Sequence, residues 1–230
     1  ILTGKLVSVA MITSLSLTGR LSFIAQRMLI QISRTLRPAL GQMIGEGKRD
    51  RSFSVFRYNL MLSSAIAAVL VACILSVNRY FVAWWVGDVH YAGGLVDVLI
   101  GTQVLVFFWN VQFMTILTSD KQMKEQTIVR IAQLLIGIGA SIYLGRIYGL
   151  AGIIGGMVMA ALMTSFWYLP MVVCQKFGQS FRDLIVNDLS RMVLFSVSVV
   201  AFAWYVRGVE AIGDSLGAML FRGFLTGITG

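Results

Sequence analysis

Charged residues are scarce in this sequence: Asp, Glu, Lys and Arg make up 13% of 230 residues, whereas soluble domains carry about a quarter. Hydrophobic residues make up 57% and recur in long runs along the whole chain. So few charges among so many apolar residues exclude a water-soluble fold. The sequence therefore predicts an integral membrane protein with one continuous membrane domain over residues 1–230.

Residue types with catalytic or ligating roles are also few. The two cysteines, Cys73 and Cys174, lie in apolar runs that the predicted topology places on opposite sides, so no disulfide is expected. The single histidine, His90, has no cluster of ligand residues at metal spacing, so we expect no metal and no cofactor. Paired carboxylates at depth, a His beside a nucleophile and a glycine-rich phosphate loop are all missing. The chain is therefore not expected to be an enzyme, and no catalytic residue is predicted.

Seven hydrophobic segments approach or exceed the length that crosses a bilayer, which is about 20 apolar residues. Each should be helical, because an isolated strand cannot satisfy its backbone hydrogen bonds in lipid. The segments are 9–36, 54–78, 95–118, 126–145, 150–174, 190–206 and the incomplete 215–230. The chain opens without Met and closes inside an apolar run, so we expect a fragment of a longer all-α membrane protein.

Two further stretches have a helical pattern of their own. Segment 175–191 places Phe and Leu at spacings of three to four with Arg and Asp between them, which predicts an amphipathic helix on the membrane surface. Gly152, Gly156 and Ala160 open the fifth span with a row of small residues, which favours close helix packing over a nucleotide-binding loop.

Lys and Arg concentrate in alternate loops, which predicts the orientation of the chain. The rich loops are 34–51, 119–130 and 175–191, and the loops between them contribute only Arg79, Arg146 and Arg207. The loops rich in Lys and Arg should therefore face the cytoplasm. Retention of these loops and attraction to anionic headgroups explain the net charge of +9, so membrane lipids are expected partners and nucleic acid is not.

Two arginines fall within the first span, where an ionisable side chain costs at least about 2.5–3.5 kcal/mol. Arg20 and Arg27 are seven residues apart, so they share one helix face, and Arg34 extends the row to the cytoplasmic edge. Snorkelling explains Arg20 equally well, and loop charge explains Arg34. Arg27 lies near the middle of the span, and no Asp or Glu lies deep within a span to pair with it. An anionic substrate in a water-filled cavity is the expected partner.

Amide side chains recur at helical intervals in later spans. Gln103 and Asn110 are seven residues apart on the third, and Gln126, Arg130 and Gln133 share a face of the fourth. Such amides often serve as hydrogen-bond partners between membrane helices. As a set they also describe a polar, cationic cavity. The candidate substrate-binding residues are therefore Arg20, Arg27, Gln103, Asn110 and Gln133.

Short pieces along the chain, taken in order, carry a resemblance to a known family. They are Gly19-Arg20-Leu21 in the outer part of a helix, Pro38 followed by a cytoplasmic turn at 45–50, Trp85-Val86-Gly87 near the outer face, a cytoplasmic turn at 119–124 and a Gly-Leu-Ala-Gly turn at 149–152. In this order and topology, residues 1–175 resemble the C-terminal half of polysaccharide-biosynthesis, O-antigen-type lipid-linked oligosaccharide flippases of the multidrug/oligosaccharidyl-lipid/polysaccharide exporter superfamily.

The resemblance implies the second lobe of a MATE-like transporter, in which two six-helix lobes surround a central cavity. Residues 1–175 would form that lobe, and 176–230 a surface helix plus appended, truncated helices. The protein would flip an anionic lipid-linked oligosaccharide to the outer leaflet of the cell inner (plasma) membrane by alternating access. Its partners would be this substrate, the missing N-terminal lobe and polysaccharide polymerase machinery. Arg20 and Arg27 would bind the diphosphate or acidic sugars, and the amides would bind sugar hydroxyls.

Two alternative functions stay open at this point. A cation-coupled multidrug exporter of the same superfamily needs a carboxylate at membrane depth, which the pattern does not provide in this half. A non-transporting scaffold of a polysaccharide assembly complex would use the arginines as helix-packing charges.

Overall fold

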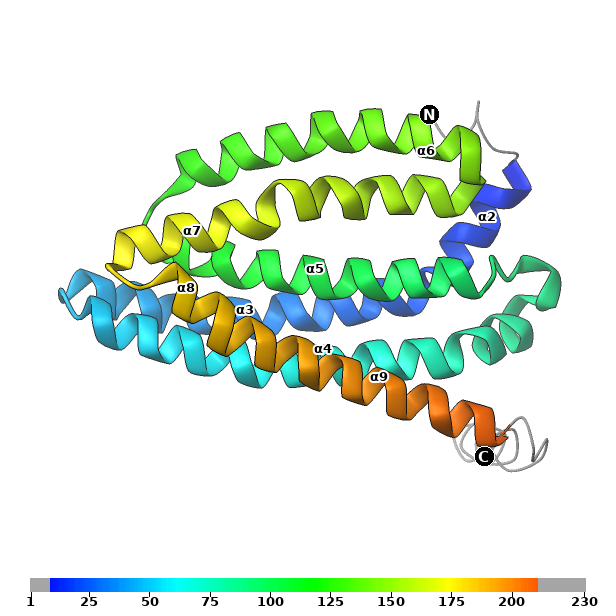
Figure 1. Ribbon diagram of the computed structural model, residues 1–230, viewed down its shortest axis with the longest axis horizontal. Helices are drawn as coiled ribbons and strands as arrows, with labels where there is room; N and C mark the ends of the chain where they lie inside the picture. The colour runs from blue at the N-terminus through cyan, green and yellow to red at the C-terminus, as the bar shows by residue number, and fades with distance from the viewer. Residues whose placement is uncertain (1–8, 211–230) are drawn as a thin grey trace.

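A computed structural model describes residues 9–210, and every regular element in that range is a helix (Figure 1). In chain order they are α2 (Val9–Thr18), α3 (Arg20–Gly45), α4 (Arg49–Val86), η1 (Asp88–His90), α5 (Gly94–Ser119), α6 (Met123–Met163), α7 (Ser165–Phe177), α8 (Phe181–Asp183), η2 (Leu184–Leu189) and α9 (Ser190–Glu210). Four helical stretches are long and apolar enough to cross a membrane: Arg49–Val86, Gly94–Ser119, Met123–Phe177 and Phe181–Phe202.

The predicted all-helical class and the membrane-spanning character are therefore confirmed for the described part of the chain. The count of about seven spans and the two-lobe architecture stay predictions. The last predicted segment, 215–230, lies outside the described residues.

The helices share one main hydrophobic core, and α5 lies at its centre because it packs against α3, α4, α6 and α7. Leu29 of α3, Phe56 of α4, Phe113 of α5 and Leu169 of α7 are all fully buried in this core. The rings of Phe56 and Phe113 meet edge to face with their centroids 5.3 Å apart. Between helices in a bilayer, such close van der Waals contact replaces water exclusion as the attractive force.

The three Lys- and Arg-rich connections, α3–α4, α5–α6 and α7–α8, gather at one end of the bundle, on the left in Figure 1. Arg49 links them: its guanidinium donates to Asp120 Oδ1 at 3.0 Å and to the Lys176 carbonyl oxygen at 3.0 Å. It also lies 5.6 Å from the centroid of the Phe177 ring. The loops that the sequence assigns to the cytoplasm thus lie together on one side.

The chain reverses direction within α6 at Gly149, so the stretch Met123–Phe177 is a hairpin of two antiparallel arms (Figure 1). Gly149 has φ 59° and ψ −131°, a conformation that suits glycine and strains other residues. The arms approach closely: a Cβ added at Gly152 would lie 2.0 Å from Leu144 O, and one at Gly156 2.5 Å from Ser141 N. The predicted close packing of small residues is therefore confirmed.

The first predicted span, 9–36, differs from the structure because it is divided at Gly19. α2 ends at Thr18, one residue before Gly19, and is tilted away from the axis of α3. α3 continues past Pro38 to Gly45 (Figure 1). Contacts from α4 and from the loop before α5 hold the end of α2. The Thr18 carbonyl accepts from Asn78 Nδ2 at 3.0 Å, and the Thr18 hydroxyl accepts from the Ala92 N–H at 3.1 Å.

The separate surface helix expected over 175–191 also differs. α7 ends at Phe177, where Gly178 adopts the left-handed conformation, and from Phe181 the chain runs through the π-helical turn η2 directly into α9. Leu184 is 2% exposed and belongs to the main core, and α9 packs along α4. The amphipathic pattern is present, but its apolar side is covered by protein helices rather than by lipid headgroups.

Candidate functional site

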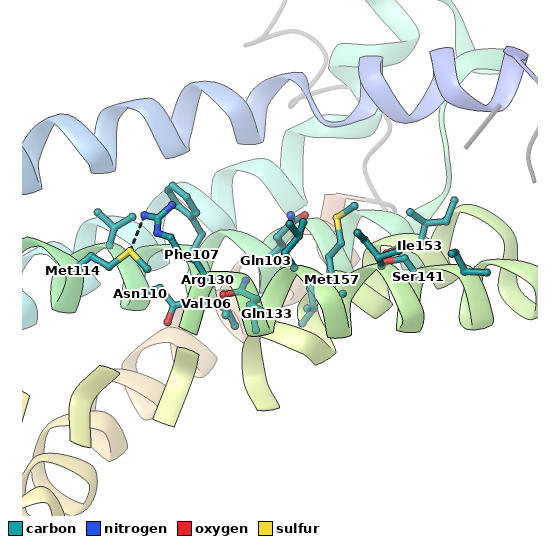
Figure 2. A pocket seen from close by; sticks show the side chains of 17 residues that line it. Gln103, Val106, Phe107, Asn110, Met114, Arg130, Gln133, Ser141, Ile153 and Met157 are labelled. Atoms are coloured by element: carbon teal, nitrogen blue, oxygen red, sulfur yellow. Dashed lines mark hydrogen bonds between the residues drawn. The ribbon is translucent and has the colours of Figure 1, made fainter. Parts of the chain in front are cut away.

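A cavity of about 570 Å³ lies between α5 and the two arms of α6 (Figure 2). Three of the five predicted site residues, Gln103, Asn110 and Gln133, line it, so the structure brings these amides together. Gln103 and Asn110 share a face of α5 because seven residues are close to two helical turns. Ligand sites commonly have volumes of about 300–1,000 Å³, so this α5–α6 cavity is large enough for a small molecule or part of a larger one.

The second arm of α6 closes the cavity against the first. Ser141 Oγ in the first arm donates to the Ile153 carbonyl at 3.0 Å, and both residues line the cavity. Gly137, another lining residue, faces Ala160 of the second arm, where a Cβ would be in ordinary van der Waals contact at 3.5 Å. The turn at Gly149 thus builds two of the three walls from one continuous segment.

Asn110 presents an unused acceptor at this site. Its Nδ2 donates to Ser165 Oγ at 2.7 Å, which holds the amide in place between α5 and α7. The residue is 7% exposed, and its Oδ1 is buried without a hydrogen-bond partner. A buried acceptor without a donor costs about 1–3 kcal/mol, so this oxygen is an unsatisfied group in the packing around Asn110 and not an accessible part of the cavity wall.

Arg130, near the start of α6, is the cation of the cavity (Figure 2). Within the described residues its one hydrogen bond runs from Nη2 to the Met114 sulfur at 2.8 Å, and it makes no ion pair there. A thioether is a weak acceptor, so most of the five guanidinium donors stay available. The lining of the cavity contains no Asp or Glu, and its field is therefore positive.

The two predicted site arginines lie elsewhere, on the exposed face of α3. Arg20, Arg27 and Arg34 are all exposed on this face, and we call them the arginine row. Arg27 and Arg34 border a shallow hollow between side chains of α3 itself, separate from the α5–α6 cavity. In the described part of the chain, no carboxylate lies within ion-pair distance of any of the three.

In the described structure the three amides line one cavity and the two arginines lie on another face, so the single polar cavity expected from the sequence stays a prediction. The arginines lie apart because of the way α3 packs. Its buried side, with Leu29, Ser33 and Leu40, faces the core, so the arginine row points away from it.

An ion pair with a buried carboxylate and a partly exposed guanidinium connects α4 to the turn before α9, and sequence reasoning missed it. Arg57 donates from Nη2 to Asp188 Oδ1 at 2.8 Å and from Nε to Oδ2, so both carboxylate oxygens are engaged. Asp188 is 0% exposed. The only sequence signal for Asp188 was an acidic residue within the amphipathic segment 175–191. Such a residue usually lies on a solvent-exposed helix face, so the pattern did not indicate a buried position.

A second missed cluster lies at the end of the bundle opposite the Lys- and Arg-rich turns. Asp97, in the first turn of α5, is 2% exposed. It accepts from Asn78 Nδ2 at 2.6 Å and from the Tyr91 hydroxyl. With the bond from Asn78 to the carbonyl of Thr18, this network joins the ends of α2, α4 and α5. It also buries a carboxylate at the end of a predicted span, and nothing in the sequence indicated that burial.

No protein-family model, curated protein or solved structure matches this chain, and the family resemblance therefore stands on the residues quoted for it.

Proposed function

We propose that this chain is the second lobe of a membrane transporter that flips an anionic lipid-linked oligosaccharide from the cytoplasmic to the outer leaflet of the inner (plasma) membrane by alternating access. The observation that carries the proposal is the arginine row of α3. These cations are exposed on a helix of a strongly apolar protein and have no acidic partner among the described residues.

The length of the row fits a path across the bilayer. Arg20 and Arg34 are 14 residues apart in the sequence, which corresponds to about 21 Å along a helix of 1.5 Å per residue. The hydrocarbon core of a bilayer is about 30 Å thick. Arginine binds phosphate oxygens through two parallel hydrogen bonds, so a diphosphate could pass from one guanidinium to the next.

Arg27 occupies the middle of this row and gives the sharpest test. In the full-length protein reconstituted in liposomes, Arg27→Ala should abolish flipping of a fluorescent undecaprenyl-diphosphate-linked sugar, and Arg27→Lys should retain part of it. Arg146→Ala is the matched control, because Arg146 is an exposed arginine of α6 that borders neither the α5–α6 cavity nor the hollow on α3. Flipping at the wild-type rate in Arg27→Ala would reject the role of the row.

The cation-coupled multidrug exporter is a second candidate. Such a transporter needs a carboxylate at membrane depth, and Asp97 is a buried carboxylate, although it lies in the first turn of α5 at the end of the bundle. Asp97→Asn separates the two functions. For an exporter, this substitution should abolish ion-dependent drug efflux, whereas a flippase of anionic lipids should show no drug efflux before or after it.

The non-transporting scaffold is tested in the same liposomes. A scaffold would leave the labelled lipid in its original leaflet even with the wild-type protein, while polysaccharide assembly in cells would still require the protein.

A further inference from the structure

The walls of the α5–α6 cavity are mostly apolar, which is unexpected for a site that contacts sugars. Between its few polar groups lie side chains such as Val106, Phe107, Leu134, Ile138 and Met157. Sugar hydroxyls need a dense set of hydrogen-bond partners, because a buried polar group without one is destabilising. A hydrocarbon chain needs none and gains van der Waals contact with such walls.

The cavity also differs from end to end. On α5 its lining runs from Gln103 to Met114, which is about 16 Å at 1.5 Å per residue. Arg130 lies beside Met114, at the end nearer the Lys- and Arg-rich turns, while Ile153 and Ser141 lie toward the other end (Figure 2). The α5–α6 cavity thus has a cation at one end and apolar walls along its length. It is complementary to a molecule with one anionic end and an apolar chain.

We infer that the α5–α6 cavity binds the lipid part of an amphipathic phosphate, with the phosphate at Arg130 and the hydrocarbon chain along the apolar walls. This inference rests on the proposed function, and it narrows the substrate contact in this lobe to the lipid end. In this arrangement the α5–α6 cavity holds the lipid, and the saccharide lies outside it. The amides that line the cavity are Gln103, Asn110 and Gln133.

Photolabelling with farnesyl phosphate that carries a diazirine on its chain tests the inference directly. The full-length protein in lipid nanodiscs is irradiated with this probe, digested and mapped by mass spectrometry. Adducts should concentrate on cavity residues of α5 and α6, such as Val106, Leu134 and Met157. Unlabelled farnesyl phosphate should compete, while farnesol and a soluble oligosaccharide such as maltotetraose should compete much less.

Adducts spread evenly over exposed apolar residues outside the cavity, such as Leu62 and Val193, would overturn the inference. Equal competition by farnesol would also overturn it, because the phosphate would then contribute nothing to binding.

Variants of Arg130 test the polar end. Arg130→Ala should weaken the competing affinity of farnesyl phosphate by about tenfold to hundredfold, as expected for the loss of a charged hydrogen bond, and Arg130→Lys should recover part of it. Arg130 is exposed and makes no ion pair in the described structure, so the variant should fold. Arg146→Ala, on the same helix, is the control and should bind as wild type. Unchanged affinity in Arg130→Ala would refute the placement of the phosphate.

The binding result is separable from the flipping result. If labelling maps to the cavity while flipping survives Arg27→Ala, the lipid site stands and the role of the arginine row fails. If flipping is lost in Arg27→Ala while labelling is dispersed, the transport proposal stands and the lipid site is rejected.

Discussion

Replacing Arg57 by alanine should destabilise the protein by about 2–3 kcal/mol, because it leaves a fully buried carboxylate without its partner. Asp188 is 0% exposed and accepts two hydrogen bonds from Arg57. Removal of one member of a fully buried pair costs about 3–5 kcal/mol. The Arg57 side chain is 39% exposed, so water reaches the pair from one side and lowers this estimate.

Thermal unfolding of the full-length protein in detergent measures the effect. For a chain of this size, 1 kcal/mol corresponds to about 2–4 °C, so the midpoint for Arg57→Ala should fall by about 4–12 °C. Arg57→Lys keeps the charge but loses the bidentate hydrogen bonding to Asp188. Its unfolding midpoint should lie between those of the wild type and Arg57→Ala. Arg182→Ala is the control, because Arg182 is an exposed arginine without an ion pair in the described structure.

The double variant Arg57→Leu with Asp188→Leu separates charge from packing. It removes both polar partners together, so it should unfold closer to the wild-type temperature than Arg57→Ala does. If Arg57→Ala unfolds within about 1 °C of the wild type, the reasoning about an unpaired buried charge is refuted. If the double variant is as unstable as Arg57→Ala, the loss comes from packing and not from the charge.

Two further substitutions test other contacts by the same assay. Asn78→Leu removes the donor to Asp97 Oδ1 at 2.6 Å and should lower the unfolding midpoint by several degrees; an unchanged midpoint would show that this network adds no stability. Gly156→Ala should lower it as well, because its Cβ would lie 2.5 Å from Ser141 N, whereas Gly155→Ala, with nothing within 4 Å, should not. Equal effects of the two glycine substitutions would contradict the close approach of the α6 arms.

Hydrophobic length located most of the helices from the sequence. The expected spans 54–78 and 95–118 lie within α4 and α5, because long apolar runs bounded by charge leave little choice of structure in lipid. The turn at Gly149 was also visible, since it falls between two such runs. Helix positions in a membrane protein are thus a local property of the chain.

The partners of each helix face were not visible in the sequence. Periodicity placed Gln103 with Asn110, and the structure keeps them together in one cavity. It also placed Arg27 with Arg20, but it carried no information on whether that face meets α5 or points away. The same uncertainty hid the burial of Asp188, because an apolar stripe is equally suited to lipid headgroups and to the side of another helix.

The bonds of Arg49 constrain how the helices can move at the Lys- and Arg-rich end of the bundle. This residue of α4 holds the start of the α5–α6 turn through Asp120 and the end of α7 through the Lys176 carbonyl. In addition, Lys176 Nζ lies 3.1 Å from Glu125 Oε1, which brings in α6. The ends of four helices are therefore fastened to one another at this side and cannot separate while these bonds hold. Under the proposed alternating-access mechanism these ends would move together, so a crosslink between two of them should leave flipping intact.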